Sequence, residues 1–202
     1  WAACYPARVS QAAAKRRVTY AEYLAAEAAS EQRHEFIAGE VIAMAGGTIE
    51  HGRLLSSMTG LLREALGRGG RPCVVLPSDV RVRIRAADRA TYPDLHVVCG
   101  DISRDPDDHN AVVNPVVIVE VLSDSTADTD RSEKFADYRK LASLREYILV
   151  SQRARRVEIY RRDGRRWTLE EYGPGERFSI AALDVEMAVD EIYTDGLGAI
   201  VA

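Results

Sequence analysis

Apolar runs rich in β-branched residues alternate along the chain with segments whose apolar positions recur every three or four residues. The second pattern spans residues 48–66, where Leu54, Met58 and Leu62 fall on one helix face and Thr48 can cap the start. Apolar runs predict strands over residues 73–84, 95–99, 116–122 and 146–151, all expected in one sheet. A further helix is predicted over residues 130–142, because Asp130 can cap it and Glu133 follows three residues later.

Weaker signals flank this core at both ends. Thr19 and Glu22 predict the start of a short helix, and residues 34–45 read as a hairpin that turns near Gly39. Residues 157–172 predict a second hairpin around the dipeptide Asp163-Gly164. We therefore predict an α/β domain with a mixed central sheet and added hairpins at both ends. Of the 202 residues, 1–18 are expected to form a loosely held tail and 19–202 a single domain.

Two carboxylates stand where a buried strand is expected. Asp94 precedes the strand over residues 95–99, and Glu120 interrupts a run of Val and Ile. A carboxylate in a buried strand needs a partner, a proton or a metal, because burying an unpaired charge is costly. Asp94 has an alternative reading as a turn residue after Pro93. Two such carboxylates on neighbouring strands would suit a divalent cation with oxygen ligands.

Composition narrows the class of protein. The formal net charge is −4, which argues against a protein that simply coats nucleic acid. No run of about 18 apolar residues is present, so no membrane span is expected. The three cysteines lack the spacing of a zinc site, and their odd number argues against a disulfide framework. A reducing cytoplasm is therefore the expected compartment.

The order of the motifs resembles one nuclease family. The matching pieces, spread over residues 19–193, are Glu35-Phe36-Ile37-Ala38-Gly39-Glu40-Val41-Ile42, His51, Ser78-Asp79-Val80-Arg81-Val82, Tyr92-Pro93-Asp94, Glu120-Val121-Leu122-Ser123-Asp124-Ser125-Thr126, Asp130-Arg131, Lys134, Tyr138 and Glu146-Tyr147. Together they resemble the PD-(D/E)XK nuclease superfamily, and within it the Uma-two-type putative restriction endonuclease family. The resemblance implies a restriction-endonuclease-like core, a DNA substrate, and a homodimer.

The resemblance also implies roles for particular residues. Asp94, Glu120 and the carbonyl of Val121 would hold Mg²⁺ or Mn²⁺, which accept such oxygen ligands. The superfamily's usual lysine two residues after the glutamate is absent, because Leu122 stands there. Lys134, near the start of the next helix, is the expected substitute that orients the attacking water. Three more matching residues are possible accessory groups of the site: Glu40, His51 and Asp79.

Alternatives remain open at this stage. Residues 145–166 carry eight arginines against three acidic residues, and they form either a solvated hairpin face or a DNA contact through Arg153, Arg155 and Arg156. The favoured function is a metal-dependent endonuclease that hydrolyses DNA phosphodiester bonds. The alternative is a catalytically silent nuclease-like fold that serves as a binding or assembly module. A metal hydrolase for small phosphoesters ranks lowest, because the chain lacks a histidine-rich site.

Overall fold

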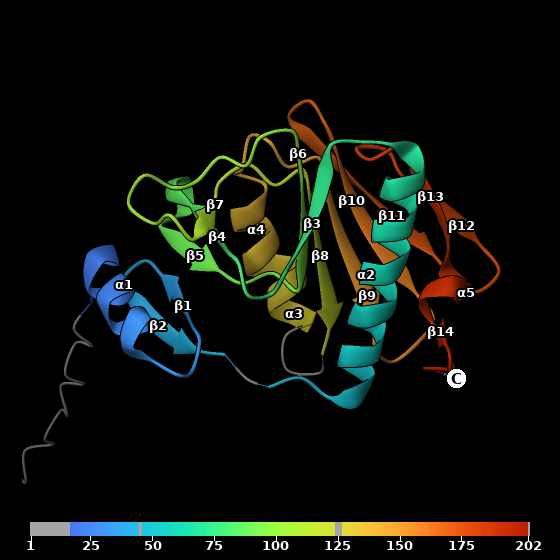
Figure 1. The fold of residues 1–202 in the computed structure, drawn as a ribbon, viewed down its shortest axis with the longest axis horizontal. Coiled ribbons are helices and arrows are strands. Elements are labelled where there is room, and N and C mark those ends of the chain that lie inside the picture. Colours follow the sequence, from blue (N-terminus) through green and yellow to red (C-terminus); the bar gives the residue numbers. More distant parts are fainter. Residues whose placement is uncertain (1–16, 45, 124–126, 202) are drawn as a thin grey trace, which may run out of the picture.

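A six-stranded mixed sheet forms the centre of the computed structural model, which describes residues 17–44, 46–123 and 127–201 (Figure 1). The sheet has the order β11-β10-β9-β8-β6-β3. Its strands are β3 (Cys73–Pro77), β6 (Leu95–Cys99), β8 (Val117–Leu122), β9 (Glu146–Ser151), β10 (Val157–Asp163) and β11 (Arg166–Tyr172). Strands β8 and β9 are parallel, and the other neighbours are antiparallel. The predicted α/β fold with a mixed central sheet is therefore confirmed.

A second, five-stranded sheet lies beside the first and has the order β2-β1-β5-β4-β7. Its strands are β1 (His34–Ile37), β2 (Glu40–Ala43), β4 (Arg81–Ile84), β5 (Arg89–Thr91) and β7 (Ala111–Val112), with the short helix η1 (Arg85–Ala87) between β4 and β5. The hairpin of β1 and β2 turns at Ala38 and Gly39, which both have positive φ. Helix α1 (Tyr20–Ala29) packs Tyr23 against Phe36 of this sheet, and its start carries the predicted capping box of Thr19 and Glu22. Of the predicted tail, residues 1–16 lie outside the described part of the chain.

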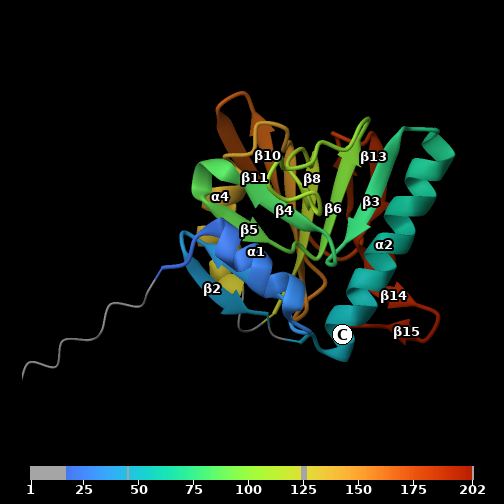
Figure 2. The ribbon, with the colours of Figure 1, turned by 60° about the vertical axis from the view of Figure 1, so that its left-hand side comes forward.

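Helices cover both faces of the central sheet. On one face lies α2 (Ile49–Gly69), which runs alongside β3 in Figure 2 and buries Leu54, Met58 and Leu62. The C-terminal segment completes this core with β12 (Arg177–Ile180), β13 (Val185–Ala188), α5 (Val189–Ile192), β14 (Thr194–Asp195) and β15 (Gly198–Ala199). On the other face lie α3 (Ala127–Thr129), η2 (Asp130–Lys134) and α4 (Phe135–Tyr138). No helix among the described residues is long and apolar enough to cross a membrane.

The prediction of one strand over residues 73–84 is wrong. Strand β3 ends at Pro77, and β4 begins at Arg81 in the other sheet. The amide of Val80 donates to the carbonyl of Pro77 at 3.2 Å, which closes a turn over Ser78 and Asp79. Proline has no amide hydrogen for a ladder, and aspartate favours turns, so the chain changes sheets here. Asp79 consequently lies in a turn and not in the middle of a strand.

The predicted helix over residues 130–142 begins earlier, ends earlier and is not uniform. It is helical from Ala127 to Tyr138, and its central part, η2, is a π-helix. Asp130 is therefore not a cap but a buried residue inside the helical segment. Beyond Tyr138 the chain turns so that Leu141 and Leu144 enter the core, which explains the early end. π-Bulges of this kind are frequent at functional sites.

The cysteines also correct the sequence analysis. Cys73 and Cys99 face each other in the register of β3 and β6 and form a disulfide. The odd cysteine count therefore did not exclude a disulfide bond. The pairing escaped the sequence because it depends on which residue of β6 lies opposite Cys73, and hydrophobic periodicity does not fix that register. The disulfide also removes the cysteine argument for a reducing compartment.

Candidate metal and nuclease site

The register of β6 and β8 brings Asp94 and Glu120 together. Leu95 pairs with Val119, so Asp94, one residue before β6, lies opposite Glu120. The amide of Asp94 is 3.4 Å from Oε2 of Glu120. Val119 and Val121 belong to the core under α2, so the alternating side chain of Glu120 points to the other face, toward η2 and α4. The two carboxylates that interrupt the apolar pattern are therefore neighbours on one face.

Asp94 is fixed through one of its two carboxylate oxygens. Its Oδ2 accepts the amide of Val121 at 2.7 Å and lies 3.1 Å from Nε2 of His51. His51 stands in the first turn of α2, whose start is capped by Thr48. The hydrogen bond to Asp94 raises the pKa of His51 despite partial burial. None of the described residues donates a hydrogen bond to Oδ1 of Asp94.

Glu120 is held mainly through one oxygen, with a longer contact from the Asp94 amide to the other, and it is nearly inaccessible. Its Oε1 accepts from Nζ of Lys134 at 3.1 Å and from the hydroxyl of Tyr138 at 2.8 Å. The residue is only 3% exposed. Burial raises the pKa of Glu120 to about 8, the charge of Lys134 acts against that rise, and the charge of Asp94 adds to it. A cation at Oε2 would therefore compensate a charge that this environment disfavours.

Lys134 lies between two buried carboxylates. Besides Glu120, its ammonium contacts Oδ1 of Asp130 at 2.9 Å. Burial alone would lower the pKa of Lys134, but Glu120 and Asp130 outweigh it, so the pKa is raised. The raised pKa keeps the ammonium protonated, so it can orient or stabilise an oxygen. Lys134, at the end of the π-helical turn, and Tyr138, four residues on in α4, both contact Glu120, while Asp130 of the same turn contacts Lys134.

Two site neighbours were missed by the sequence analysis. Asp130 read as a helix cap, yet it is 1% exposed and pairs with Lys134. Glu35 of β1 is one of the motif residues, but the sequence analysis assigned no role to it. Its charge contributes to the raised pKa of Lys134. Glu35 is anchored by Thr91 and by the buried Arg89, whose Nη2 lies 3.0 Å away. No sequence signal separates such residues from surface carboxylates, because only the fold buries them.

Other predicted residues lie elsewhere. Glu40 is exposed on β2, and Asp79 forms an ion pair with Arg33 at 2.6 Å. Arg155 donates a hydrogen bond to the carbonyl of Val201 and lies near Asp190. These contacts within the protein engage its guanidinium group. The other two predicted arginines are Arg153 and Arg156. Both lie in the segment after β9, at the same end of the sheet as the site. The motif residues Asp124, Ser125 and Thr126 lie outside the described part of the chain.

The donor set fits a hard divalent cation. The described residues contain no group of three or more His, Cys, Asp or Glu side chains arranged to hold a metal ion. Mg²⁺, however, is commonly bound through one or two carboxylates together with water and substrate phosphate oxygens. Asp94 and Glu120 each keep one oxygen outside their strong hydrogen bonds, at a place where burial disfavours the uncompensated carboxylate. An oxygen-rich set without cysteine argues against a structural zinc site.

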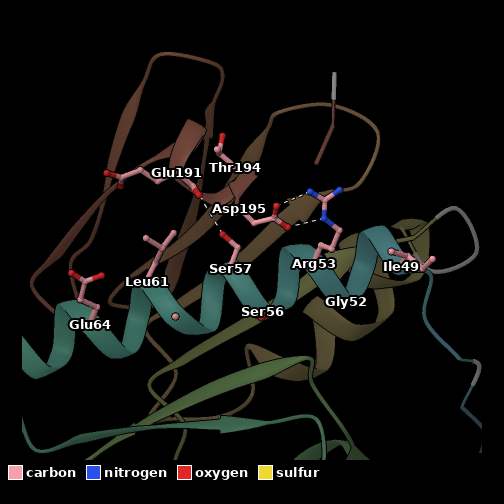
Figure 3. A pocket seen from close by; sticks show the side chains of 11 residues that line it. Ile49, Gly52, Arg53, Ser56, Ser57, Leu61, Glu64, Glu191, Thr194 and Asp195 are labelled. Atoms are coloured by element: carbon pink, nitrogen blue, oxygen red, sulfur yellow. Dashed lines mark hydrogen bonds and ion pairs between the residues drawn. The ribbon is translucent and has the colours of Figure 1, made fainter. Parts of the chain in front are cut away.

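A separate cavity of about 610 Å³ lies on the outer side of α2, away from the carboxylate pair (Figure 3). It is floored by the small residues Gly52, Ser56 and Gly60 and bordered by the ion pair of Arg53 with Asp195. It contains none of the residues that surround Glu120. The candidate site therefore lies in the contacts between β6, β8 and η2 and not in this cavity.

Comparisons with known proteins point to one family. The Uma2 family, described as "Putative restriction endonuclease", matches residues 20–190. Two uncharacterized proteins of Synechocystis sp. are similar over most of their length. One, sll1609, is 39% identical over 76% of this chain and 86% of its own; the other, slr1290, is 31% identical over 85% and 89%. A crystal structure of a putative nuclease belonging to DUF820 from Anabaena variabilis superposes with a TM-score of 0.67 at 16% identity, covering 81% of this chain and 90% of that one.

Proposed function

This chain belongs to the Uma2 family of putative restriction endonucleases, and on that premise we propose that it is an endonuclease that hydrolyses DNA phosphodiester bonds with Mg²⁺ or Mn²⁺. The observation that carries the proposal is the shared contact of Lys134 and Tyr138 with the carboxylate that faces Asp94. Two acidic groups and a protonated amine within one cluster can hold a divalent cation and stabilise the negative charge that develops in phosphodiester hydrolysis. A purely structural ion pair would not need the second carboxylate.

The residues have distinct tasks in this proposal. Asp94 and Glu120, with the carbonyl of Val121, would hold the cation. When bound, the cation offsets phosphate charge and lowers the pKa of a water molecule. Lys134 would orient that water and stabilise the negative charge that develops on the phosphate, since its raised pKa keeps it protonated. His51 and the amide of Val121 fix the orientation of Asp94 through its Oδ2.

A plasmid-nicking assay tests the proposal. Supercoiled plasmid is incubated with the wild-type protein and with Glu120→Ala, each with Mg²⁺, with Mn²⁺ and with EDTA. We expect nicking by the wild type with either metal, no nicking in EDTA, and a loss of at least about 10²-fold in Glu120→Ala. Equal nicking by both proteins would rule out Glu120 as part of the site.

A catalytically silent binding module is the second candidate, and the near-complete burial of Glu120 favours it, because a buried carboxylate is less accessible to a substrate. Measuring metal binding and plasmid nicking on the same protein distinguishes the two candidates. Tight Mn²⁺ binding in a calorimetric titration, without nicking on any plasmid form, would support the silent module. Nicking that depends on Glu120 would exclude it.

A further inference from the structure

A buried carboxylate on β10 gathers two arginines from different parts of the chain. Arg131 of η2 donates to Glu158 through Nε at 2.9 Å and through Nη2 at 2.6 Å. Nη2 of Arg156, in the segment before β10, lies 3.2 Å from the same carboxylate. The side chain of Glu158 is 5% exposed, whereas those of Arg131 and Arg156 are 31% and 46% exposed. The cluster thus hides its negative charge and presents two guanidinium groups.

We call Arg131, Arg156 and Glu158 the diarginine cluster. It lies on the same line of cross-strand pairs as the candidate site. Glu120 pairs with Leu149 on β9, and Leu149 pairs with Glu158 on β10. Val157 and Ile159 belong to the core under α2, so Glu158 points to the opposite face, as Glu120 does. Neighbouring strands are about 4.8 Å apart, which puts the two carboxylates roughly 10 Å from each other.

The cluster and the site also lie toward the same end of the sheet. Arg156 belongs to the segment between β9 and β10, and Gln152 in this segment accepts a hydrogen bond from Thr48 at 2.9 Å. Thr48 caps the helix that carries His51. The N-terminal end of α2 and helix α3, which precedes η2, both lie in the lower half of the molecule in Figure 1.

The charges of the cluster favour an anion. Two guanidinium groups share the one buried carboxylate, and the charge of the exposed Asp128 also acts on Arg131. Each guanidinium has five N–H donors, and the bonds to Glu158 use only some of them. The carboxylate of Glu171 faces Glu158 from β11 but is exposed, so water screens it more than the buried Glu158.

We propose that Arg131 and Arg156, held in place by Glu158, form a subsite for a backbone phosphate of the DNA strand whose scissile phosphate lies at Asp94 and Glu120. The inference rests on the proposed nuclease function. The arginine fork matches phosphate oxygens in two-point contacts, and a buried carboxylate that fixes two forks beforehand lowers the entropic cost of binding. Phosphates follow one another every ~3.4 Å of duplex axis along a strand, and the helical path sets them further apart than that, so a group about 10 Å away meets a phosphate close to the cleaved bond.

The salt dependence of DNA binding tests the subsite without cleavage. Binding of a fluorescent duplex is measured in EDTA at several salt concentrations for the wild type, Arg131→Gln, Arg156→Gln and the control Arg53→Gln. Arg53 is a suitable control because it is also paired, is 25% exposed and lies on the other face of the sheet. Each lost phosphate contact should reduce the slope of log K against log salt by about 0.9. We expect that reduction in both cluster variants and an unchanged slope in Arg53→Gln.

Two further variants separate binding from folding. Arg131→Gln with Glu158→Gln removes the buried carboxylate together with Arg131, so that no buried charge is left unpaired, while Arg156, whose side chain is 46% exposed, keeps its charge near water. Arg131→Lys keeps a positive charge and should recover part of the slope. Unchanged slopes in the cluster variants, or no measurable DNA binding by the wild type, would overturn the subsite. Nicking by the wild type with unchanged slopes would overturn the subsite alone, whereas changed slopes without any nicking would support the subsite and contradict the nuclease proposal.

Discussion

Lys134 is the residue on which the proposed chemistry depends most, because its ammonium is held between Glu120 and Asp130. It contacts a proposed metal ligand but has no free electron pair to offer a metal. Lys134→Ala should therefore keep Mn²⁺ affinity within about twofold and lose cleavage by about 10²-fold or more. Lys134→Arg should recover little, because the planar guanidinium cannot replace a compact ammonium. Metal titration and nicking on the same preparation check this, and undiminished cleavage would assign water activation to another group.

Glu120 connects stability with pH in the metal-free protein. Burial raises its pKa in the folded chain to about 8, above the usual 4.5, so the folded state holds a proton that the unfolded state releases. The contribution of this proton to the free energy of unfolding is complete below pH 4.5 and is lost as the pH rises toward 8. In EDTA, Glu120→Gln should abolish this fall and be more stable than the wild type at pH 8, by about 1 kcal/mol or more.

Urea unfolding of both proteins at pH 5 and pH 8 measures the effect. Mn²⁺ titration of the same two samples should show that Glu120→Gln no longer binds the metal. Equal Mn²⁺ affinity in the two proteins would remove Glu120 from the proposed ligand set.

His96 shows the opposite pH behaviour. It is fully buried on β6, and neither ring nitrogen has a hydrogen-bond partner among the described residues. Burial lowers its pKa to about 4 from the usual 6.5, so the unfolded chain takes up a proton that the folded chain refuses. The contribution of neutral His96 to the free energy of unfolding is therefore complete above pH 6.5. It is lost as the pH falls from 6.5 to 4, by up to about 3 kcal/mol.

The variant His96→Leu should flatten that acid limb. Thermal unfolding of the wild type, His96→Leu and the exposed-histidine control His109→Gln from pH 4 to 7 checks it. A wild-type acid limb that persists in His96→Leu would assign the loss of stability to other groups.

At the scale of elements, the disulfide fixes the edge of the central sheet. It joins β3 to β6 across 26 residues of sequence. Closing a loop of that length restricts the unfolded chain and contributes about 3 kcal/mol in the chain-entropy account. Reduction should therefore lower the urea midpoint of the wild type, whereas Cys73→Ser with Cys99→Ser should unfold identically with and without reductant.

The comparison is best made in a Cys4→Ser background, which prevents thiol exchange with the third cysteine. If reduction leaves the wild-type midpoint unchanged, the hydrogen-bonded ladder alone holds β3 in place.

At the scale of the whole molecule, we expect a homodimer, because a duplex has two strands and a two-fold pair supplies two sites. The edge strand β2 offers a surface for pairing, since Val41 and Ile42 are 41% and 46% exposed. Sedimentation at tens of micromolar should give a dimer, and Ile42→Lys should dissociate it. Leu169→Lys, at a residue that is 48% exposed on the opposite edge strand β11, serves as the control. A wild-type monomer at that concentration would contradict the expectation.

The sequence was sufficient wherever local pattern decides structure. Helical spacing of leucines predicted α2, and β-branched runs predicted β6, β8 and β9 within one or two residues. Glu120 was recognisable because a carboxylate amid β-branched neighbours violates the apolar pattern. The ordered motifs also indicated the family, whose match covers residues 20–190.

Only the tertiary structure decided which distant groups meet. Asp130 became a buried partner of Lys134 through the π-helical turn, and Cys73 met Cys99 through strand register. The break at Pro77 sent one predicted strand into two sheets, and Glu158 brought two arginines from different parts of the chain into one cluster. Periodicity reports which face of an element is buried, but not what lies opposite it. The partners of a buried charge are set by packing between segments that are far apart in the chain, and that information is not present in any local window.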